Sequence, residues 1–339
     1  ILQAGGVFFV LTPTTRSDNL DAIIDNCQAE CIITSNSLVH TLDGFKTTNC
    51  SFHNCLLCGT HRPESNTSIP LTLFSDVLDY EKTTLPQIDI IDRDLACLVY
   101  TSGSTGVPKG VMSDHSNVVF VANAIISILE NSKDDVILST LPLSFDYGLY
   151  QLLMCFIFGG TLVLEKNFYF PTQVLKRIAE EKVTGFPGVP TIFTMLLQMD
   201  LSQYNFANLR YMTNTAAAMP VSHIKEIRKK FPKTTFYSMY GLTETKRTLY
   251  LPPEKLDEKP GSVGIAIPGT EVWLVDEDDN RLPPGETGEL VIRGRHVMRG
   301  YWRDTEMSAK RYRPGPIPGE MVCYSGDIFH MDEDGFLYF

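Results

Sequence analysis

The chain has 339 residues, of which 43% are hydrophobic and 20% charged, as in a globular protein large enough for more than one hydrophobic core. Its formal net charge of −11 argues against nucleic acid as a main partner, because contacts with phosphates need clustered Lys and Arg. No apolar run reaches membrane-spanning length, and no charged segment followed by an apolar one marks a signal peptide. The chain opens on Ile1 rather than methionine, so we expect a piece of a longer protein. Its eight cysteines are scattered, several of them in apolar stretches, as expected of reduced thiols in a cytoplasmic protein.

The first part of the chain alternates apolar strand patterns with an amphipathic helix. Strands are expected at 6–11, 31–34 and 54–59, and a helix capped by Ser17 or Asp18 is expected to reach about residue 29. This alternation predicts parallel βαβ units. Four possible zinc ligands lie nearby, namely Cys50, His53, Cys55 and Cys58. Their spacing is too compressed for paired zinc knuckles, so we do not expect a metal there.

The most informative stretch follows, between an apolar strand predicted over 96–100 and an apolar helix predicted over 117–131. It is rich in small, hydroxyl-bearing and basic residues: Thr101, Ser102, Gly103, Ser104, Thr105, Gly106 and Lys109. Glycines let a backbone approach a ligand closely, and the hydroxyls and the ammonium can donate to one anion. The stretch therefore favours a phosphate-binding loop over a solvated linker, although its spacing is not that of a Walker A loop.

Downstream, strand and helix patterns alternate up to about residue 259, and short strands separated by turns follow. Strands are expected at 136–141, 161–165, 209–213 and 234–239, with helices at 171–182, at 191–199 and from Pro220, placed at the first helical position, to residue 230. From about Pro260, short alternating runs lie between Gly and Pro turns, at 271–275, 289–292, 321–324 and 336–339. We therefore predict an α/β unit over 1–259, with parallel βαβ layers flanked by helices. A smaller antiparallel, barrel-like β-rich unit should cover 260–339.

Two later motifs carry candidate site residues. The pentapeptide 240–244, YGLTE, follows a predicted strand and combines an aromatic ring with a carboxylate, although it could be a plain turn. The tetrapeptide 324–327, YSGD, places a carboxylate that suits a ribose diol, although Asp after Gly is usually a turn residue. Glu289 and Trp302 belong to glycine-rich stretches that we interpret as scaffold, and His296 is a lone histidine of the kind that is more often structural.

The loop LVYTSGSTGVPKGVM, the YGLTE pentapeptide and the SGD triplet resemble, in order and rough distance, the motifs of the adenylate-forming (AMP-forming) superfamily. That superfamily includes acyl-CoA synthetases, amino-acid adenylation domains and luciferases, and the resemblance covers essentially the whole chain. It implies that a small-molecule carboxylic acid reacts with MgATP to give an acyl-adenylate and pyrophosphate. CoA or the phosphopantetheine of a carrier protein would then accept the acyl group. The superfamily's C-terminal lid would lie beyond Phe339, so we expect this chain alone to adenylate poorly.

The resemblance also implies a role for each motif residue. Lys109 and residues 101–106 would hold the ATP phosphates, Thr243 the α-phosphate and Glu244 the Mg²⁺ ion. The rest of the nucleotide would lie against Ala216, Ala217, Tyr240, Gly241 and Asp327. The acid substrate would contact Phe145, Asp146, Tyr147, Asn214, Met239 and Arg247. Ser325 departs from the superfamily's usual threonine and should keep the same backbone geometry.

Several alternatives stay open at this point. Asp146 could bind a substrate ammonium, as in amino-acid adenylation domains, or could be the N-cap of a helix that begins at Tyr147. Lys246 and Arg247 could pair with an acidic group of the substrate or point to solvent. A non-catalytic nucleotide-binding module and a kinase that uses the same loop are the two rival classes of function.

Overall fold

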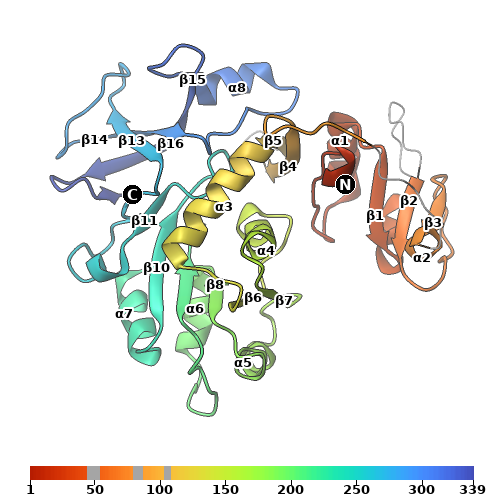
Figure 1. Ribbon diagram of the computed structural model, residues 1–339, viewed down its shortest axis with the longest axis horizontal. Coiled ribbons are helices and arrows are strands. Elements are labelled where there is room, and N and C mark those ends of the chain that lie inside the picture. Colours follow the sequence, from red (N-terminus) through yellow and green to blue (C-terminus); the bar gives the residue numbers. More distant parts are fainter. Residues whose placement is uncertain (44–53, 79–86, 103–107) are drawn as a thin grey trace.

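The computed structural model describes residues 1–43, 54–78, 87–102 and 108–339. Within these residues, a three-stranded, a seven-stranded and a five-stranded sheet follow one another along the chain, with a two-stranded hairpin between the first two (Figure 1). The seven-stranded sheet lies at the centre, the three-stranded unit lies to one side of it, and the five-stranded sheet covers its other end. The predicted mixed α/β fold with a parallel sheet and a C-terminal antiparallel sheet is confirmed.

The N-terminal unit is built on three parallel strands. Its elements are η1 (Leu2–Ala4), α1 (Ser17–Cys27), β1 (Cys31–Ser35), η2 (Asn36–Leu42), β2 (Asn54–Cys58), β3 (Leu71–Leu73) and α2 (Phe74–Leu78). Leu20, Ile24 and Leu57 are buried together between α1 and the sheet. The strand predicted at 6–11 is wrong, because in that stretch only Phe8 pairs, as an isolated bridge to Cys97. A short apolar run between Gly6 and Pro13 packs as extended chain without a ladder of its own.

The hairpin follows this unit and frames the predicted phosphate loop. It consists of β4 (Leu95–Ser102) and β5 (Pro108–Asp114), which pair antiparallel and place Thr101 opposite Lys109. The strand predicted at 96–100 is therefore confirmed, whereas β5 was missed because Pro, Lys and Gly are poor strand formers. Asp114 ends β5 and caps the next helix by accepting a 2.8 Å hydrogen bond from the Asn117 N–H.

The central sheet has the strand order β12-β11-β10-β9-β8-β6-β7, with parallel pairing from β7 to β10. Its strands are β6 (Val136–Ser139), β7 (Thr161–Leu164), β8 (Gly185–Gly188), β9 (Tyr211–Asn214), β10 (Thr235–Tyr240), β11 (Leu249–Leu251) and β12 (Ile265–Ala266). Its helices are α3 (His115–Leu129), α4 (Asp146–Phe158), α5 (Pro171–Glu180), α6 (Pro190–Leu197) and α7 (Val221–Lys230). The helix predicted after Pro220 is α7, but Pro220 is its N-cap rather than its first helical residue.

Both faces of the central sheet are buried, as parallel sheets require. One face packs against α5, α6 and α7 through a cluster that includes Phe186, Phe193 and Phe236. The other face packs against α3 and α4 through a cluster that includes Ile125 and Tyr150. The apolar stripe of the helix predicted at 171–182 thus belongs to the core. Since neither face is open, the ends of the strands are left to hold polar sites.

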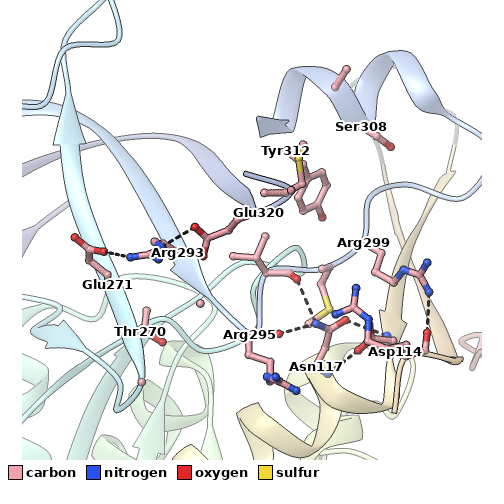
Figure 2. Close-up of a pocket in the computed structure, with 18 residues that line it drawn as sticks. Asp114, Asn117, Thr270, Glu271, Arg293, Arg295, Arg299, Ser308, Tyr312 and Glu320 are labelled. Atoms are coloured by element: carbon pink, nitrogen blue, oxygen red, sulfur yellow. Dashed lines mark hydrogen bonds and ion pairs between the residues drawn. The ribbon is translucent and has the colours of Figure 1, made fainter. Parts of the chain in front are cut away.

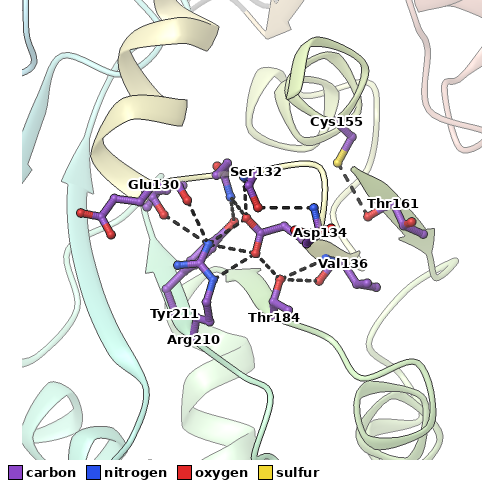
Figure 3. A network of polar contacts seen from close by, with 12 residues as sticks. Glu130, Ser132, Asp134, Val136, Cys155, Thr161, Thr184, Arg210 and Tyr211 are labelled. Carbon is purple, nitrogen blue, oxygen red and sulfur yellow. Dashed lines mark hydrogen bonds and ion pairs between the residues drawn. The ribbon is translucent and has the colours of Figure 1, made fainter. Parts of the chain in front are cut away.

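A polar network joins the amino ends of three neighbouring strands (Figure 3). Asp135, directly before β6, accepts hydrogen bonds from Thr184 Oγ1 at 2.6 Å and from Arg210 Nη2 at 2.8 Å. The Ser132 N–H donates to the same carboxylate at 2.9 Å. Thr184 precedes β8 and Arg210 precedes β9, so one buried carboxylate ties together the starts of β6, β8 and β9.

The C-terminal sheet is antiparallel and has the order β13-β14-β16-β15, with β17 on β16. The elements of this part are η3 (Pro253–Lys255), β13 (Thr270–Val275), β14 (Thr287–Gly294), α8 (Thr305–Arg311), β15 (Tyr312–Pro314), β16 (Met321–Met331) and β17 (Leu337–Tyr338). Its core, which includes Leu290 and Phe329, also takes in Leu249 of β11 and Val111 of β5. Strand β12 pairs with β11, so residues 265–266 belong to the central sheet. The predicted boundary between the α/β unit and the β-rich unit, after residue 259, stays a prediction.

Candidate functional site

The base of the predicted phosphate loop is a pair of strand ends. Thr101 and Ser102 close β4 and pair with Lys109 and Pro108 of β5. Gly103, Ser104, Thr105 and Gly106 lie outside the described residues. The Lys109 Nζ atom lies 5.7 Å from the centre of the Tyr301 ring, which places its ammonium over an aromatic face. The second strand of the hairpin therefore begins beside Tyr301.

Glu244 is buried beside the same tyrosine. Its Oε1 atom accepts a 2.5 Å hydrogen bond from the Tyr301 hydroxyl and lies 4.0 Å from Arg311 Nε. Burial and the Glu244 carboxylate both raise the pKa of Tyr301, so this phenol stays a hydrogen-bond donor. The turn from β10 to Glu244 depends on Gly241, because a Cβ atom there would collide with the Lys246 carbonyl oxygen.

Tyr240 and Asp327 come from different sheets and meet. Tyr240 ends β10, and its hydroxyl donates a 2.6 Å hydrogen bond to Oδ2 of Asp327 in β16. Burial and this hydrogen bond raise the pKa of Tyr240. The Tyr240 ring also packs edge-on against Phe329, with ring centres 5.0 Å apart. Two motifs separated by 87 residues therefore share one place in the fold.

The turn before Asp327 is held by its neighbours. Gly326 has a φ of +72°, which favours glycine, and its N–H donates a 2.8 Å hydrogen bond to Glu289 Oε1. The Ser325 hydroxyl accepts a 3.1 Å hydrogen bond from the Asp327 N–H. A threonine hydroxyl could accept the same backbone hydrogen bond as Ser325. Glu289 holds the turn through the Gly326 N–H, in line with the structural role predicted for it.

Two side chains that the sequence did not single out link these motifs. Tyr301 contacts both Lys109 and Glu244, and its one sequence signal is the Gly-Tyr-Trp stretch that we interpreted as scaffold. Arg311 ends α8, lies beside Glu244, and faces Gly326, where a Cβ atom would come within 2.7 Å of Nη1. A basic residue at a helix C-terminus is common, so no distinctive pattern marks Arg311 in the sequence.

Two of the predicted acid-binding residues, Tyr147 and Arg247, contact each other at the carboxyl ends of β8 and β9. The Tyr147 hydroxyl donates to the Thr213 carbonyl oxygen at 2.8 Å and lies 3.3 Å from that of Gly188. Burial raises the pKa of Tyr147 to about 12. The Arg247 guanidinium lies 4.2 Å from the centre of the Tyr147 ring. Carboxyl ends of parallel strands are where ligands bind in open α/β sheets.

Asp146 lies next to this tyrosine at the start of α4. The alternative that Asp146 is the N-cap is wrong, because Phe145 holds that position and Asp146 is the first helical residue. Its Oδ1 atom accepts a 2.8 Å hydrogen bond from the Tyr147 N–H, and its negative charge suits the helix N-terminus. Phe145 is 60% exposed.

Three other predicted residues occupy less distinctive positions. Asn214 is buried at the end of β9 and donates a 3.3 Å hydrogen bond to the carbonyl oxygen of Ala217. Ala216 has a φ of +75°, which marks a tight turn at the strand exit. Met239 is buried in the cluster under α3 and α4, and its place in a substrate pocket stays a prediction.

Lys246 and Arg247 do not point to solvent, so that alternative is wrong. Their exposed fractions are 1% and 3%. The Lys246 ammonium donates a 2.9 Å hydrogen bond to the Thr243 carbonyl oxygen, while Arg247 Nε has no partner among the described residues. Burial lowers the pKa of both side chains, and the Asp146 carboxylate opposes this shift in both.

His296 and Trp302 lie in packing positions, in line with their predicted structural roles. His296 is buried and stacks on Phe120 with ring centres 5.7 Å apart, and burial lowers its pKa to about 4. The imidazole is therefore neutral at pH 7. The Trp302 indole N–H donates a 3.0 Å hydrogen bond to the Asn26 carbonyl oxygen at the end of α1.

A separate cavity of about 840 Å³ lies between α3, β13, β14 and α8 (Figure 2). None of the predicted site residues that the structure describes lines it. Several of its charged side chains are already paired, since Arg293 contacts Glu271 and Glu320 at 2.9 Å and Arg295 lies 3.5 Å from Asp92. Arg299 has no carboxylate within ion-pair distance among the described residues, and its guanidinium donates a 2.9 Å hydrogen bond to the Arg93 carbonyl oxygen.

The described residues include no group of three His, Cys, Asp or Glu side chains that could hold a metal. Two of the four zinc candidates, Cys50 and His53, lie outside these residues. Mg²⁺ is usually bound by one or two carboxylates together with substrate phosphates. The buried carboxylate of Glu244, which shares Tyr301 with Lys109 and lies 4.0 Å from Arg311, fits that mode of binding.

Residues 1–302 match the family of AMP-binding enzymes, and the chain belongs to this family. The long-chain-fatty-acid–CoA ligase of Bacillus subtilis is 33% identical over 275 residues, which cover 78% of this chain and 47% of the relative. A linear gramicidin synthase of Brevibacillus parabrevis is 28% identical over 100% of this chain and 4% of the relative. The chain spans about half of the Bacillus ligase and 63% of its Salmonella typhimurium counterpart.

Solved structures share the fold. The crystal structure of VinN is 32% identical with a TM-score of 0.80, covering 98% of this chain and 79% of that one. A putative long-chain-fatty-acid CoA ligase from Rhodopseudomonas palustris reaches a TM-score of 0.85 at 22% identity, over 98% of this chain and 79% of that one. None of the helices in the described part combines the length and the apolar character that crossing a bilayer requires.

Proposed function

We propose that this chain provides the nucleotide and acid sites of an adenylate-forming ligase. A substrate carboxylate oxygen would attack the α-phosphorus of ATP, the bond to the bridging oxygen would break, and pyrophosphate would leave. The acyl group would then pass to a thiol, either that of CoA or that of a carrier-bound phosphopantetheine. The observation that carries this proposal is the contact chain from Lys109 through Tyr301 and Glu244 to Arg311, with Tyr240 and Asp327 beside it.

The chemistry needs positioning and charge neutralisation more than covalent work by the protein. The Lys109 ammonium, at the end of the loop, would hold the departing pyrophosphate. The Thr243 hydroxyl would contact the α-phosphate. Glu244 would hold Mg²⁺, which when bound offsets the charge of the phosphates. Arg311, 4.0 Å from Glu244, would add a second positive charge on the same side.

The nucleoside would lie where the two sheets meet. Tyr240 offers an aromatic face for adenine, and Asp327 offers a carboxylate for the ribose hydroxyls. Because Asp327 Oδ2 already accepts the Tyr240 hydroxyl, this carboxylate is fixed in place before a ribose arrives. Gly241, Ala216 and Ala217 would let the backbone approach the nucleotide closely.

We further infer that the acid is an amino acid rather than a fatty acid. A fatty acid needs a pocket lined by apolar side chains. Here Asp146 and Arg247, both charged, lie around Tyr147 instead. One similar solved structure is the complex of VinN with L-aspartate, 29% identical with a TM-score of 0.69, covering 95% of this chain and 89% of that one. The Asp146 carboxylate would pair with the substrate ammonium.

ATP–pyrophosphate exchange on the full-length protein tests this proposal. We expect exchange that depends on an added carboxylic acid, and we expect amino acids to support it better than fatty or aryl acids. Release of ADP instead of AMP would identify a kinase. Binding of ATP without exchange on any acid of the panel would identify a non-catalytic nucleotide-binding module.

A further inference from the structure

Two consecutive positive charges lie inside the protein at the proposed acid site. Lys246 and Arg247 are 1% and 3% exposed, although Lys and Arg are almost never fully buried unless they are paired. Among the described residues, neither has a carboxylate within ion-pair distance, 4.0 Å. Charges buried in protein interiors are normally paired or neutralised. This pair is therefore short of negative charge.

The nearby acids do not supply the missing charge. Asp146 is the carboxylate that acts electrostatically on both cations, and one negative charge cannot balance two positive ones. Glu244 also acts on Lys246, but its Oε1 atom is engaged by the Tyr301 hydroxyl and by Arg311. Neither carboxylate lies within ion-pair distance of the Arg247 guanidinium, so the described residues leave its charge without a partner.

The geometry of Arg247 suits an anion. Its guanidinium lies 4.2 Å from the centre of the Tyr147 ring, and that ring is fixed because its hydroxyl donates to the Thr213 carbonyl oxygen at 2.8 Å. The buried Nε atom of Arg247 has no hydrogen-bond partner within the described part of the chain. A guanidinium held by an aromatic ring is already oriented to receive a carboxylate through two parallel N–H donors.

We propose that Lys246 and Arg247 form a subsite for a second acidic group of the substrate, so that the acid activated here is an amino dicarboxylate. This inference rests on the proposed function. The substrate ammonium would face Asp146, one carboxylate would react with ATP, and the other would lie against Arg247. An amino acid with one carboxylate would leave the buried charge uncompensated and would bind more weakly.

The test compares acids of equal size that differ only in charge. ATP–pyrophosphate exchange is measured on the full-length protein with L-aspartate against L-asparagine and with L-glutamate against L-glutamine. We expect kcat/KM to favour one of the two dicarboxylates over its amide. Arg247→Met should lower kcat/KM for that dicarboxylate about 10- to 100-fold, the size of a lost charged hydrogen bond, and should lower it much less for the amide, so that the preference between the two collapses. Arg247→Lys should recover part of the loss.

Arg295→Met is the control, because Arg295 is a largely exposed arginine of the separate cavity and should leave the selectivity unchanged. If amino acids support exchange but Arg247→Met does not alter the preference between acid and amide, the subsite is wrong while the proposed function stands. If no acid supports exchange, the proposed function itself fails.

Thermal unfolding separates this role from a purely structural one. Removing an uncompensated buried charge should leave the Tm of Arg247→Met equal to that of the parent or raise it. The preferred dicarboxylate should raise the Tm of the parent but not that of Arg247→Met. A drop in Tm as large as that of Arg210→Met, whose arginine is paired with Asp135, would show that Arg247 is structural and would overturn the proposal.

Discussion

The two ends of the central sheet differ in whether their buried charged side chains have partners of opposite charge. At the amino ends, the Asp135 carboxylate is matched by Arg210 at 2.8 Å and by neutral donors. At the carboxyl ends, Lys246 and Arg247 are as deeply buried but lack a matching carboxylate within the described chain. Removing one partner of a buried charge pair is costly, whereas our proposal leaves the unmatched cations for a ligand to complete. In that proposal the same strands carry a structural end and a binding end.

The largest expected loss of stability follows removal of the ion pair at the amino ends of the strands. Arg210→Met leaves the Asp135 carboxylate, 3% exposed, without its cation. We expect the free energy of unfolding to fall by about 2 kcal/mol, less than for a fully buried pair, because the Arg210 side chain is itself 41% exposed. Urea denaturation measures this loss, and exchange activity per folded molecule should not change. Arg295→Met, which breaks a largely exposed pair, is the control and should cost less than about 1 kcal/mol. Lost activity without lost stability would contradict the division between the two ends.

The next effect is on catalysis at the carboxyl end. Glu244→Gln keeps an acceptor for the Tyr301 hydroxyl but removes the charge proposed to hold Mg²⁺. We expect exchange to fall about 100- to 1000-fold, as when a group that stabilises transition-state charge is lost. Tm should stay nearly the same. Glu271→Gln, at the separate cavity, should keep its activity, and an equal loss there would argue against a specific role for Glu244.

A pH series sharpens the comparison further. Burial opposes ionisation of Asp135, but hydrogen bonds from Thr184, Ser132 and Arg210 outweigh it and lower the pKa of this carboxyl. A carboxyl with a lowered pKa stabilises the fold above its unfolded pKa of about 3.9, and this stabilisation is lost as the pH falls through the lower folded value. Asp135→Asn should therefore be less stable than the parent by a constant amount above about pH 5, and the gap should shrink below about pH 4. A gap that does not narrow in acid would refute this account.

The smallest effect concerns the nucleotide. Tyr240→Phe keeps the aromatic face and removes one hydrogen bond to Asp327, worth about 1 kcal/mol. We expect KM for ATP in the exchange assay to rise less than about tenfold. Tyr240→Ala, which also removes the ring, should raise it more. Equal effects of the two variants would mean that the ring does not contribute to nucleotide binding.

Much of the fold could be predicted because hydrophobic periodicity is strong in the central sheet. The strands expected at 136–141 and 234–239 coincide with β6 and β10 to within a few residues. The failures have local causes. Residues 6–11 are apolar but make only one bridge, at Phe8. Strand β5 forms because it pairs with β4, although its residues have a low intrinsic preference for strands.

The site residues could be predicted only where they belong to a short contiguous sequence motif. Glu244 and Asp327 were named from such motifs, but nothing in the sequence says that Tyr301 links Lys109 to Glu244. The burial of Arg247 was equally hidden, because an arginine after a turn is normally exposed. Partners that tertiary packing brings together over long stretches of chain leave no local pattern.

The position of Trp302 has a practical consequence. The chain contains two tryptophans, and this one bonds its indole N–H to the carbonyl oxygen of Asn26, at the end of α1. A Trp273→Phe variant would leave Trp302 as the single tryptophan, at the contact between α1 and the C-terminal part of the chain. Its emission would then report any loosening of that contact directly, without a dye or a label.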